Sequence, residues 1–267
     1  MFYSAKNGTI AIDNTDIDYI VFGNGKKNLL MIPGLSDGLK TAKGMAVPFA
    51  LMYKKLAKDY RVYVMSRRNV MPQGFTTSDM AKDVAVALQK LGVERTSVIG
   101  VSQGGMIAQY LAIDFPDLIE KLILTVTLAR QNDTVQKVIS TWMDMAKCGD
   151  YKSLMIDTAE KYYSEHYLKK SRWMFSLMGN VGKPKSFKRF LIMAQACIEH
   201  DAFDELVQIT CPTLVIGGKK DQIVTGEASI EISTQISGSE IHMYEEFGHA
   251  ANEEAKDFLD RIMEFCQ

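Results

Sequence analysis

The five residues Gly100-Val101-Ser102-Gln103-Gly104 constrain the fold of this chain more than any other stretch. Residues 96–99 before them predict a short buried strand, and residues 105–112 after them predict a helix. A Gly-x-Ser-x-Gly run in this setting is typical of a sharp turn that exposes the serine hydroxyl above a sheet. A Cβ at position 100 or 104 would fill the space where strand and helix approach each other. The alternative is a glycine-rich turn with a packing role only, so other parts of the chain must supply the partners of a reactive serine.

The rest of the chain alternates apolar strands with amphipathic helices. It begins with a hairpin over residues 8–23, and further strands are expected at 29–32, 61–65, 122–126, 211–218 and 241–244. Helices are expected at 48–58, 77–91, 226–236 and 251–265, and the second of them is expected to be capped by Thr77-Ser78-Asp79. This alternation predicts an α/β fold with a mostly parallel eight-stranded sheet and helices on both faces.

The alternation breaks between residues 129 and 205. This segment has no strong strand pattern, and its helical stretches are rich in aromatic residues and methionine, with a loop at 179–184. Because ligands of open α/β sheets bind at the carboxyl ends of the strands, we expect a helical cap, or lid, over such an end. The core would then comprise residues 1–128 and 206–267. The alternative is an additional helical layer with no lid role.

A serine hydroxyl is a poor nucleophile at neutral pH and needs a base that takes its proton. Histidine suits this task because its pKa lies near the operating pH. Of the four histidines, His166 and His200 fall in the helical insert and His242 lies within a strand. His249 follows the last strand directly, where the active face is expected. His249 is therefore the predicted base, and an exposed loop histidine is the alternative.

The base in turn needs a carboxylate that fixes its tautomer. Asp221 follows the penultimate strand by a short turn, whereas residues 125–129, at the end of the strand after the serine, offer no carboxylate. Asp221 is therefore the predicted acid, with a capping or loop aspartate as the alternative. Two backbone N–H groups are expected to stabilise an oxyanion, those of Gln103 and of Leu35.

Composition excludes several classes of protein. The 267 residues are 47% hydrophobic and 24% charged with a formal net charge of -1, which gives no basic excess for a nucleic acid or an anionic membrane. No apolar run is long enough to span a bilayer, and the first residues lack the pattern of a secretory signal. We therefore expect a cytoplasmic protein with free thiols and no metal site, since its cysteines lack metal-ligand spacing: Cys148, Cys197, Cys211 and Cys266.

The turn at 100–104 and the order Ser102, Asp221, His249 resemble the α/β-hydrolase superfamily over nearly the whole chain. The resemblance implies the α/β-hydrolase fold with a helical cap. The chain departs from many relatives in two places. Pro33-Gly34 stands where they carry His-Gly, and residues 65–69 stand where they carry Asp-x-Arg-Gly. A serine nucleophile argues against the haloalkane-dehalogenase branch, which uses aspartate.

These features predict a serine hydrolase of small carboxylic esters, with a small-molecule substrate and no metal or organic cofactor. Hydrolysis of a C–C bond, perhydrolysis, acyl transfer and aminopeptidase action remain open on the same residues. An aminopeptidase needs a carboxylate for the substrate amine, and the insert offers Glu160, Glu165 and Glu199. The alternative of another class is a non-catalytic small-molecule-binding protein. The oligomeric state is left open.

Overall fold

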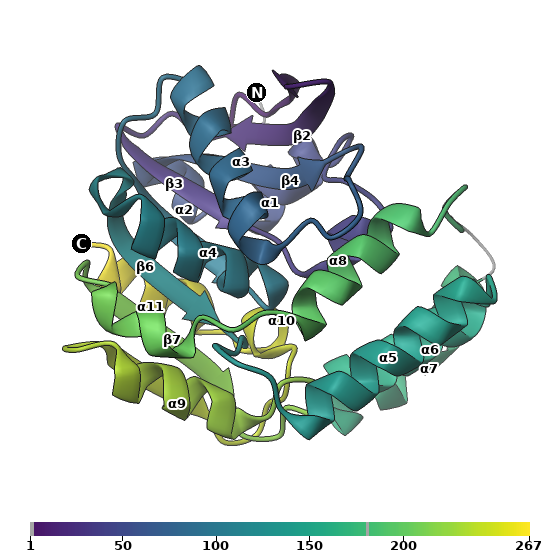
Figure 1. Cartoon of the computed structure of the whole chain (residues 1–267). Coiled ribbons are helices and arrows are strands. Elements are labelled where there is room, and N and C mark those ends of the chain that lie inside the picture. Colours follow the sequence, from purple (N-terminus) through teal and green to yellow (C-terminus); the bar gives the residue numbers. More distant parts are fainter. Residues whose placement is uncertain (1–2, 180–181) are drawn as a thin grey trace.

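One sheet organises the computed structural model, which describes residues 3–179 and 182–267 (Figure 1). Its eight described strands lie in the order β1-β2-β4-β3-β5-β6-β7-β8. Their bounds are β1 Lys6–Ile12, β2 Thr15–Phe22, β3 Lys27–Ile32, β4 Tyr60–Arg68, β5 Thr96–Val101, β6 Ile119–Thr125, β7 Thr213–Gly218 and β8 Glu240–Tyr244. Residues 180 and 181 of the loop expected at 179–184 lie outside the described residues.

The sheet is mostly parallel, as the alternation predicts. β1 pairs antiparallel with β2, and β2 pairs antiparallel with β4, whereas each of the other neighbouring pairs is parallel. Gly100 of β5 is in register with Ile32 of β3 on one side and Leu124 of β6 on the other. The glycine-serine turn therefore emerges from the middle of the sheet, between two strands that end beside it.

Helices cover both faces of the sheet, which explains why its central strands are continuously apolar. Leu30 and Ile32 of β3 belong to one core cluster, with side chains of α3, α4 and α9, while Leu29 and Met31 belong to a second cluster on the other face, with α1, α2 and α11. The bounds of these helices are α1 Ala46–Met52, α2 Leu56–Asp59, α3 Thr77–Lys90, α4 Gln103–Asp114, α9 Gly226–Gln235, α10 Ala251–Glu254 and α11 Phe258–Phe265. A short 3-10 turn η2, Pro116–Leu118, precedes β6.

Three details differ from the sequence-based expectations. The helix expected at 48–58 is two helices, α1 and α2, and the one expected at 251–265 is also two, α10 and α11. The cap of α3 is Thr76, which forms a capping box with Asp79. Thr77 does not cap the helix because its hydroxyl lies 2.9 Å from the ring nitrogen Nδ1 of buried His200.

The segment between β6 and β7 contains helices and no strand among its described residues. Its elements are α5 Asp133–Lys147, α6 Tyr151–Tyr162, α7 Glu165–Met178, α8 Lys188–Ile198 and the 3-10 helix η3 Phe203–Gln208. Figure 1 shows α5 to α8 beyond the carboxyl ends of the central strands. Within the described part of the chain, no helix combines the length and the apolar character that a membrane span requires.

Candidate active site

Ser102 lies at the turn between β5 and α4 and has a positive φ. Its φ of 54° and ψ of -121° are unfavourable for a side chain with a Cβ and cost on the order of 1–3 kcal/mol. The turn is held by neighbours, because the Ser102 N–H donates to Thr125 O at 2.9 Å and Thr127 Oγ1 donates to Ser102 O at 2.8 Å. A Cβ on Gly100 would lie 2.5 Å from Gly104 O, which explains glycine at position 100.

The loop after β3 passes directly over this turn. A Cβ on Gly104 would collide with Ile32 O and lie 2.8 Å from Pro33 O. Glycine at position 104 is therefore required by the close approach of the end of β3, and not by the strand and helix of its own turn. A Cβ on Gly34 would lie 3.3 Å from Ser102 Cβ. These contacts bring the residues after β3 against the first turn of α4.

Asp221 and His249 meet in a buried pair. His249 Nδ1 and Asp221 Oδ2 are 2.7 Å apart, and both side chains are almost fully shielded from solvent. The other carboxylate oxygen, Oδ1, accepts the backbone N–H groups of Ile223 at 2.8 Å and Val224 at 3.0 Å. The carboxylate therefore has a fixed orientation, and Nε2 is left as the nitrogen of His249 that can accept a proton.

The loops that carry this acid and this histidine are packed backbone to backbone. Lys220 N–H donates to Phe247 O at 3.0 Å. A Cβ on Gly218 would lie 2.6 Å from Phe247 O and would collide with Gly248 O, so this close approach requires glycine at position 218. The relative position of Asp221 and His249 is therefore set by main chain rather than by flexible side chains.

Leu35 and Gln103 are the first residues of two helices that start beside Ser102. Leu35 begins η1, the 3-10 helix Leu35–Gly38, and Gln103 begins α4. The N–H groups of a first helical turn have no acceptor within their own helix, so both are available donors. Leu35 lines the pocket that Ser102 also lines.

A network of buried charged side chains holds η1 in place. Asp37 of η1 accepts the backbone N–H of Arg67 at 3.0 Å, and the guanidinium of Arg189 on α8 also binds its carboxylate. Arg67 Nη2 donates to Pro33 O and to the side-chain oxygen of Gln103. Burial lowers the pKa of Arg67 to about 10, against the opposing effect of Asp37, so Arg67 stays charged at neutral pH. The residues at 65–69 that depart from the Asp-x-Arg-Gly pattern thus anchor the loop that carries Leu35.

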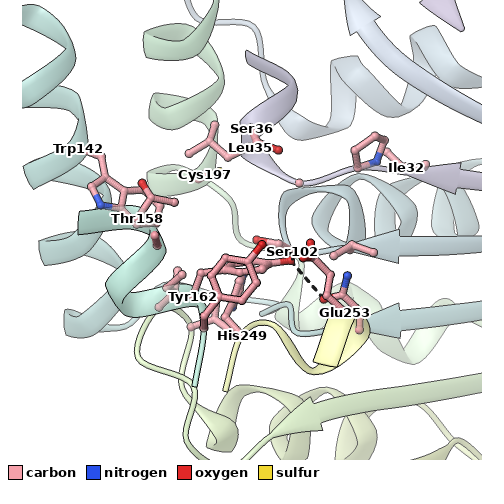
Figure 2. Close-up of a pocket in the computed structure, with 18 of the residues that line it drawn as sticks. Ile32, Leu35, Ser36, Ser102, Trp142, Thr158, Tyr162, Cys197, His249 and Glu253 are labelled. Atoms are coloured by element: carbon pink, nitrogen blue, oxygen red, sulfur yellow. Dashed lines mark hydrogen bonds between the residues drawn. The ribbon is translucent and has the colours of Figure 1, made fainter. Parts of the chain in front are cut away.

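Ser102 and His249 open into one cavity of about 380 Å³ between the strand ends and helices α5 to α7 (Figure 2). Most of its walls are aromatic or aliphatic: Phe49, Met106, Val135, Ile139, Trp142, Met155, Phe175 and Ile223. Its few polar side chains include Thr158, Cys197 and Glu253. No group of three or more side chains among the described residues is arranged to hold a metal ion.

A comparison with protein families matches residues 27–256 to the family described as alpha/beta hydrolase fold. The chain belongs to this family. The fold agrees, since the mostly parallel eight-stranded sheet is flanked by helices on both faces.

Individual relatives of this α/β hydrolase are distant but cover its full length. It is 25% identical over 269 residues to the serine hydrolase BPHL of Mus musculus, an alignment of 98% of this chain and 86% of the mouse protein. Among solved structures, an alpha/beta hydrolase enzyme from a Medee basin deep-sea metagenome library has a TM-score of 0.85 at 17% identity, covering 97% of both chains. The enol-lactonase from Burkholderia xenovorans LB400 has a TM-score of 0.82 at 20% identity, covering 97% and 99%. The similar fold and the relatives named as hydrolases identify the chain as a hydrolase.

Two residues of the site were not found by sequence reasoning. The ring of Tyr162 lies 5.3 Å from that of His249, at 68°, and the Tyr162 carbonyl accepts the N–H of Ala250 at 2.9 Å. Glu253 lines the cavity one helical turn beyond His249. Glu253 follows the predicted base by four residues, at the start of a helical pattern. This spacing was a signal that could have placed the two side chains near each other.

The three carboxylates of the insert that an aminopeptidase could have used lie outside the cavity. Glu160 and Glu165 face Arg172 at 3.5 and 4.0 Å, and Glu199 accepts a hydrogen bond from Gln195. All three are exposed, and none lines the cavity.

Proposed function

We propose that this α/β hydrolase cleaves small carboxylic esters through an acyl-enzyme on Ser102. One observation carries the proposal. The strained turn of Ser102 opens into the same cavity as His249, whose Nδ1 is held by buried Asp221 at 2.7 Å. A nucleophile, a base and a carboxylate that orients the base form the arrangement that activates a serine hydroxyl.

The reaction has two halves. Ser102 Oγ attacks the ester carbonyl carbon while His249 Nε2 takes the hydroxyl proton, and the carbonyl electrons move to an oxyanion held by the N–H groups of Leu35 and Gln103. Collapse of this intermediate breaks the C–O bond, and the alcohol leaves with the proton from His249. Water then attacks the acyl group, with His249 as base, and releases the carboxylic acid and free Ser102.

The two N–H donors act where negative charge develops. Each donor of this kind contributes about 3–4 kcal/mol to stabilisation of the transition state in serine hydrolases.

The substrate proposed is a small molecule with an apolar part. The cavity volume and its mainly apolar walls support this size and character. Helices α5, α6 and α7 contribute several of these walls, and on this basis we propose that residues 129–205 act as the cap over the site. Relatives named as serine hydrolase and enol-lactonase are consistent with cleavage of an ester bond, since a lactone is a cyclic ester.

Intact-mass measurement after treatment with a fluorophosphonate tests the proposal. Wild-type protein is expected to gain one adduct and Ser102→Ala none. Ser36→Ala is the matched control, because Ser36 is a second hydroxyl in the same cavity, and this variant is expected to gain the adduct. The reagent can be shown to bind if it raises the melting temperature of the wild-type protein. A folded wild-type protein that binds the reagent but gains no adduct would overturn the proposal in favour of ligand binding without catalysis.

A panel of substrates separates the reactions that share this mechanism. Turnover of p-nitrophenyl esters, lost in Ser102→Ala, is the expected result. Turnover confined to a peptide or to a diketone would instead assign amide or C–C bond cleavage to the same residues.

A further inference from the structure

Among its described lining residues, the cavity at Ser102 contains a single carboxylate and no basic side chain other than His249. Among the described residues that line it, Glu253 of α10 is the one acid, and no lysine or arginine is present. Figure 2 shows Glu253 on the same side of the cavity as Ser102 and His249, opposite Trp142 and Thr158. A substrate bound at Ser102 therefore lies in the field of one negative charge that no cation of the cavity wall offsets.

Two tyrosine hydroxyls hold this carboxylate without neutralising it. Tyr162 donates to Glu253 Oε1 at 3.0 Å and Tyr163 donates to Oε2 at 2.8 Å. Each carboxylate oxygen can accept a second hydrogen bond. The neighbouring Glu254 is used differently, because it binds the backbone and hydroxyl of Ser164 and lies outside the cavity.

Three tyrosines near Glu253 have raised pKa values. Burial raises the pKa of Tyr53 to about 12, with the negative charge of Glu253 as the second cause. Burial and the same charge raise the pKa of Tyr162 and of Tyr163. The three tyrosines are therefore neutral at physiological pH, and the negative charge of this wall resides on Glu253.

Packing of the aromatic rings fixes the two tyrosines beside the carboxylate. Tyr162 and Tyr163 are packed edge to face with centroids 4.9 Å apart, and Tyr163 also stacks on Tyr167 at 4.3 Å and on Phe175 at 5.3 Å. A carboxylate held in this way at the wall of a mainly apolar cavity is suited to an ammonium group and unsuited to a second carboxylate.

We propose that Glu253 is a specificity-determining residue that selects esters bearing an ammonium group. The proposal rests on the proposed function and narrows its substrate class from small esters to cationic ones. It involves recognition only, since Glu253 takes no part in the transfer of the acyl group. Anionic esters of the same size are expected to be disfavoured.

Isosteric ester pairs test the selection, because N⁺(CH₃)₃ and C(CH₃)₃ have nearly the same shape. One pair carries the group on the alcohol, butyrylcholine and 3,3-dimethylbutyl butyrate. The other carries it on the acyl part, phenyl 4-(trimethylammonio)butyrate and phenyl 5,5-dimethylhexanoate. In at least one pair, kcat/KM of the wild type is expected to favour the cation about tenfold, through charge attraction alone. The preference is expected to fall as ionic strength rises, since Glu253 is solvent-accessible.

Glu253→Gln preserves the size of the side chain and an oxygen that accepts from tyrosine. Its preference is expected to fall to about one, because kcat/KM for the cationic ester falls towards the value for the neutral ester. Glu254→Gln is the matched control one residue along the same helix, and it is expected to retain the preference. A wild type without preference for either cation, or an equal preference in Glu253→Gln, would overturn the proposal.

A binding measurement separates this proposal from the proposed function. Choline and 3,3-dimethylbutan-1-ol are titrated into wild type and Glu253→Gln, with the fluorescence of Trp142 in the cavity wall as the signal. Tighter binding of choline to wild type alone supports the role of Glu253 even if no ester is cleaved. Hydrolysis of the neutral esters without any preference for a cation would contradict the role of Glu253 and would still support the hydrolase function.

Discussion

Two histidines of this molecule, His249 and His200, have closely similar surroundings. Both are buried, at 2% and 1% exposure, and each ring meets a tyrosine ring steeply, Tyr162 at 5.3 Å and Tyr110 at 5.4 Å. They differ in their hydrogen-bond partners and in what they face. His249 binds a carboxylate and lines the cavity, whereas His200 binds neutral groups and faces the packed core.

The partners of His200 satisfy a neutral ring completely. Gln109 Oε1 is an acceptor because its Nε2 donates to Leu128 O, so His200 Nε2–H donates to it and Nδ1 accepts from the Thr77 hydroxyl. Burial lowers the pKa of His200 to about 3. Both rings are buried, so what distinguishes the predicted base is its buried carboxylate partner and its access to the cavity.

Replacement of the two histidines should separate them by the largest margin. His249→Gln is expected to lower kcat for ester cleavage by about 10⁴ to 10⁶-fold, because the serine loses its base. His200→Gln is expected to leave kcat within about threefold. Steady-state kinetics of both variants, with circular dichroism to confirm folding, provides the measurement. More than about 1% residual activity in folded His249→Gln would show that another group takes the proton.

Asp221→Asn should make the surroundings of His249 resemble those of His200. The amide nitrogen of asparagine would face Nδ1, so the ring would carry its proton on Nε2 and could no longer accept one from Ser102. The expected loss in kcat is about 10⁴-fold, as for the equivalent change in a serine protease. Thr77→Val, which removes a partner of His200, is the control and should lower stability alone. Near-normal turnover by Asp221→Asn would remove the acid from the mechanism.

The pH dependence of unfolding should reveal His200. Because its pKa is about 3 in the fold and near 6.5 when unfolded, the unfolded chain binds the additional proton between these values. Stability from neutral His200 is thus full above pH 6.5 and falls as the pH falls, by about 1.4 kcal/mol per pH unit. Urea unfolding at pH 7.5, 6 and 5 should show this loss in wild type and a shallower one in His200→Gln. Parallel pH dependences would contradict the assignment.

Short sequence patterns were enough to predict the features of the fold that depend on a few adjacent residues. The turn at 100–104, the strand ends before Asp221 and His249, and the alternation of strands and helices are each written in a few adjacent residues, and the structure brings Asp221 and His249 together. Sequence reasoning also separated His200 from His249 by position alone. The assignment of catalytic roles to these residues remains a prediction for the kinetics above.

Contacts between distant segments could not be predicted in this way. The helices expected at 48–58 and 251–265 break near Tyr53 and Ala255, although their apolar periodicity continues through both breaks. The second break leaves α10 as a short turn whose Glu253 meets Tyr162 and Tyr163 of the helical insert. Periodicity reports which side of a helix is buried, but it does not report which remote segment covers that side.

The tyrosines beside the two histidines offer the smallest expected effect and the finest distinction. Tyr162 contacts His249 by its ring and Ala250 by its carbonyl, so Tyr162→Phe keeps both contacts and should change kcat less than about twofold. Tyr162→Leu removes the ring contact, which is worth about 0.5–1.5 kcal/mol, and should lower kcat up to about tenfold.

Separate values of kcat and KM distinguish a positioning role of Tyr162 from a general loss of stability. If Tyr162 orients His249 for proton transfer, Tyr162→Leu lowers kcat with KM nearly unchanged, because the lost contact acts in the transition state. Tyr110→Leu, the matched change beside His200, should lower the melting temperature and leave kcat and KM as they are. An equal fall of kcat in both leucine variants would mean that the two tyrosine rings only stabilise the fold. Tyr162 would then have no positioning role at His249.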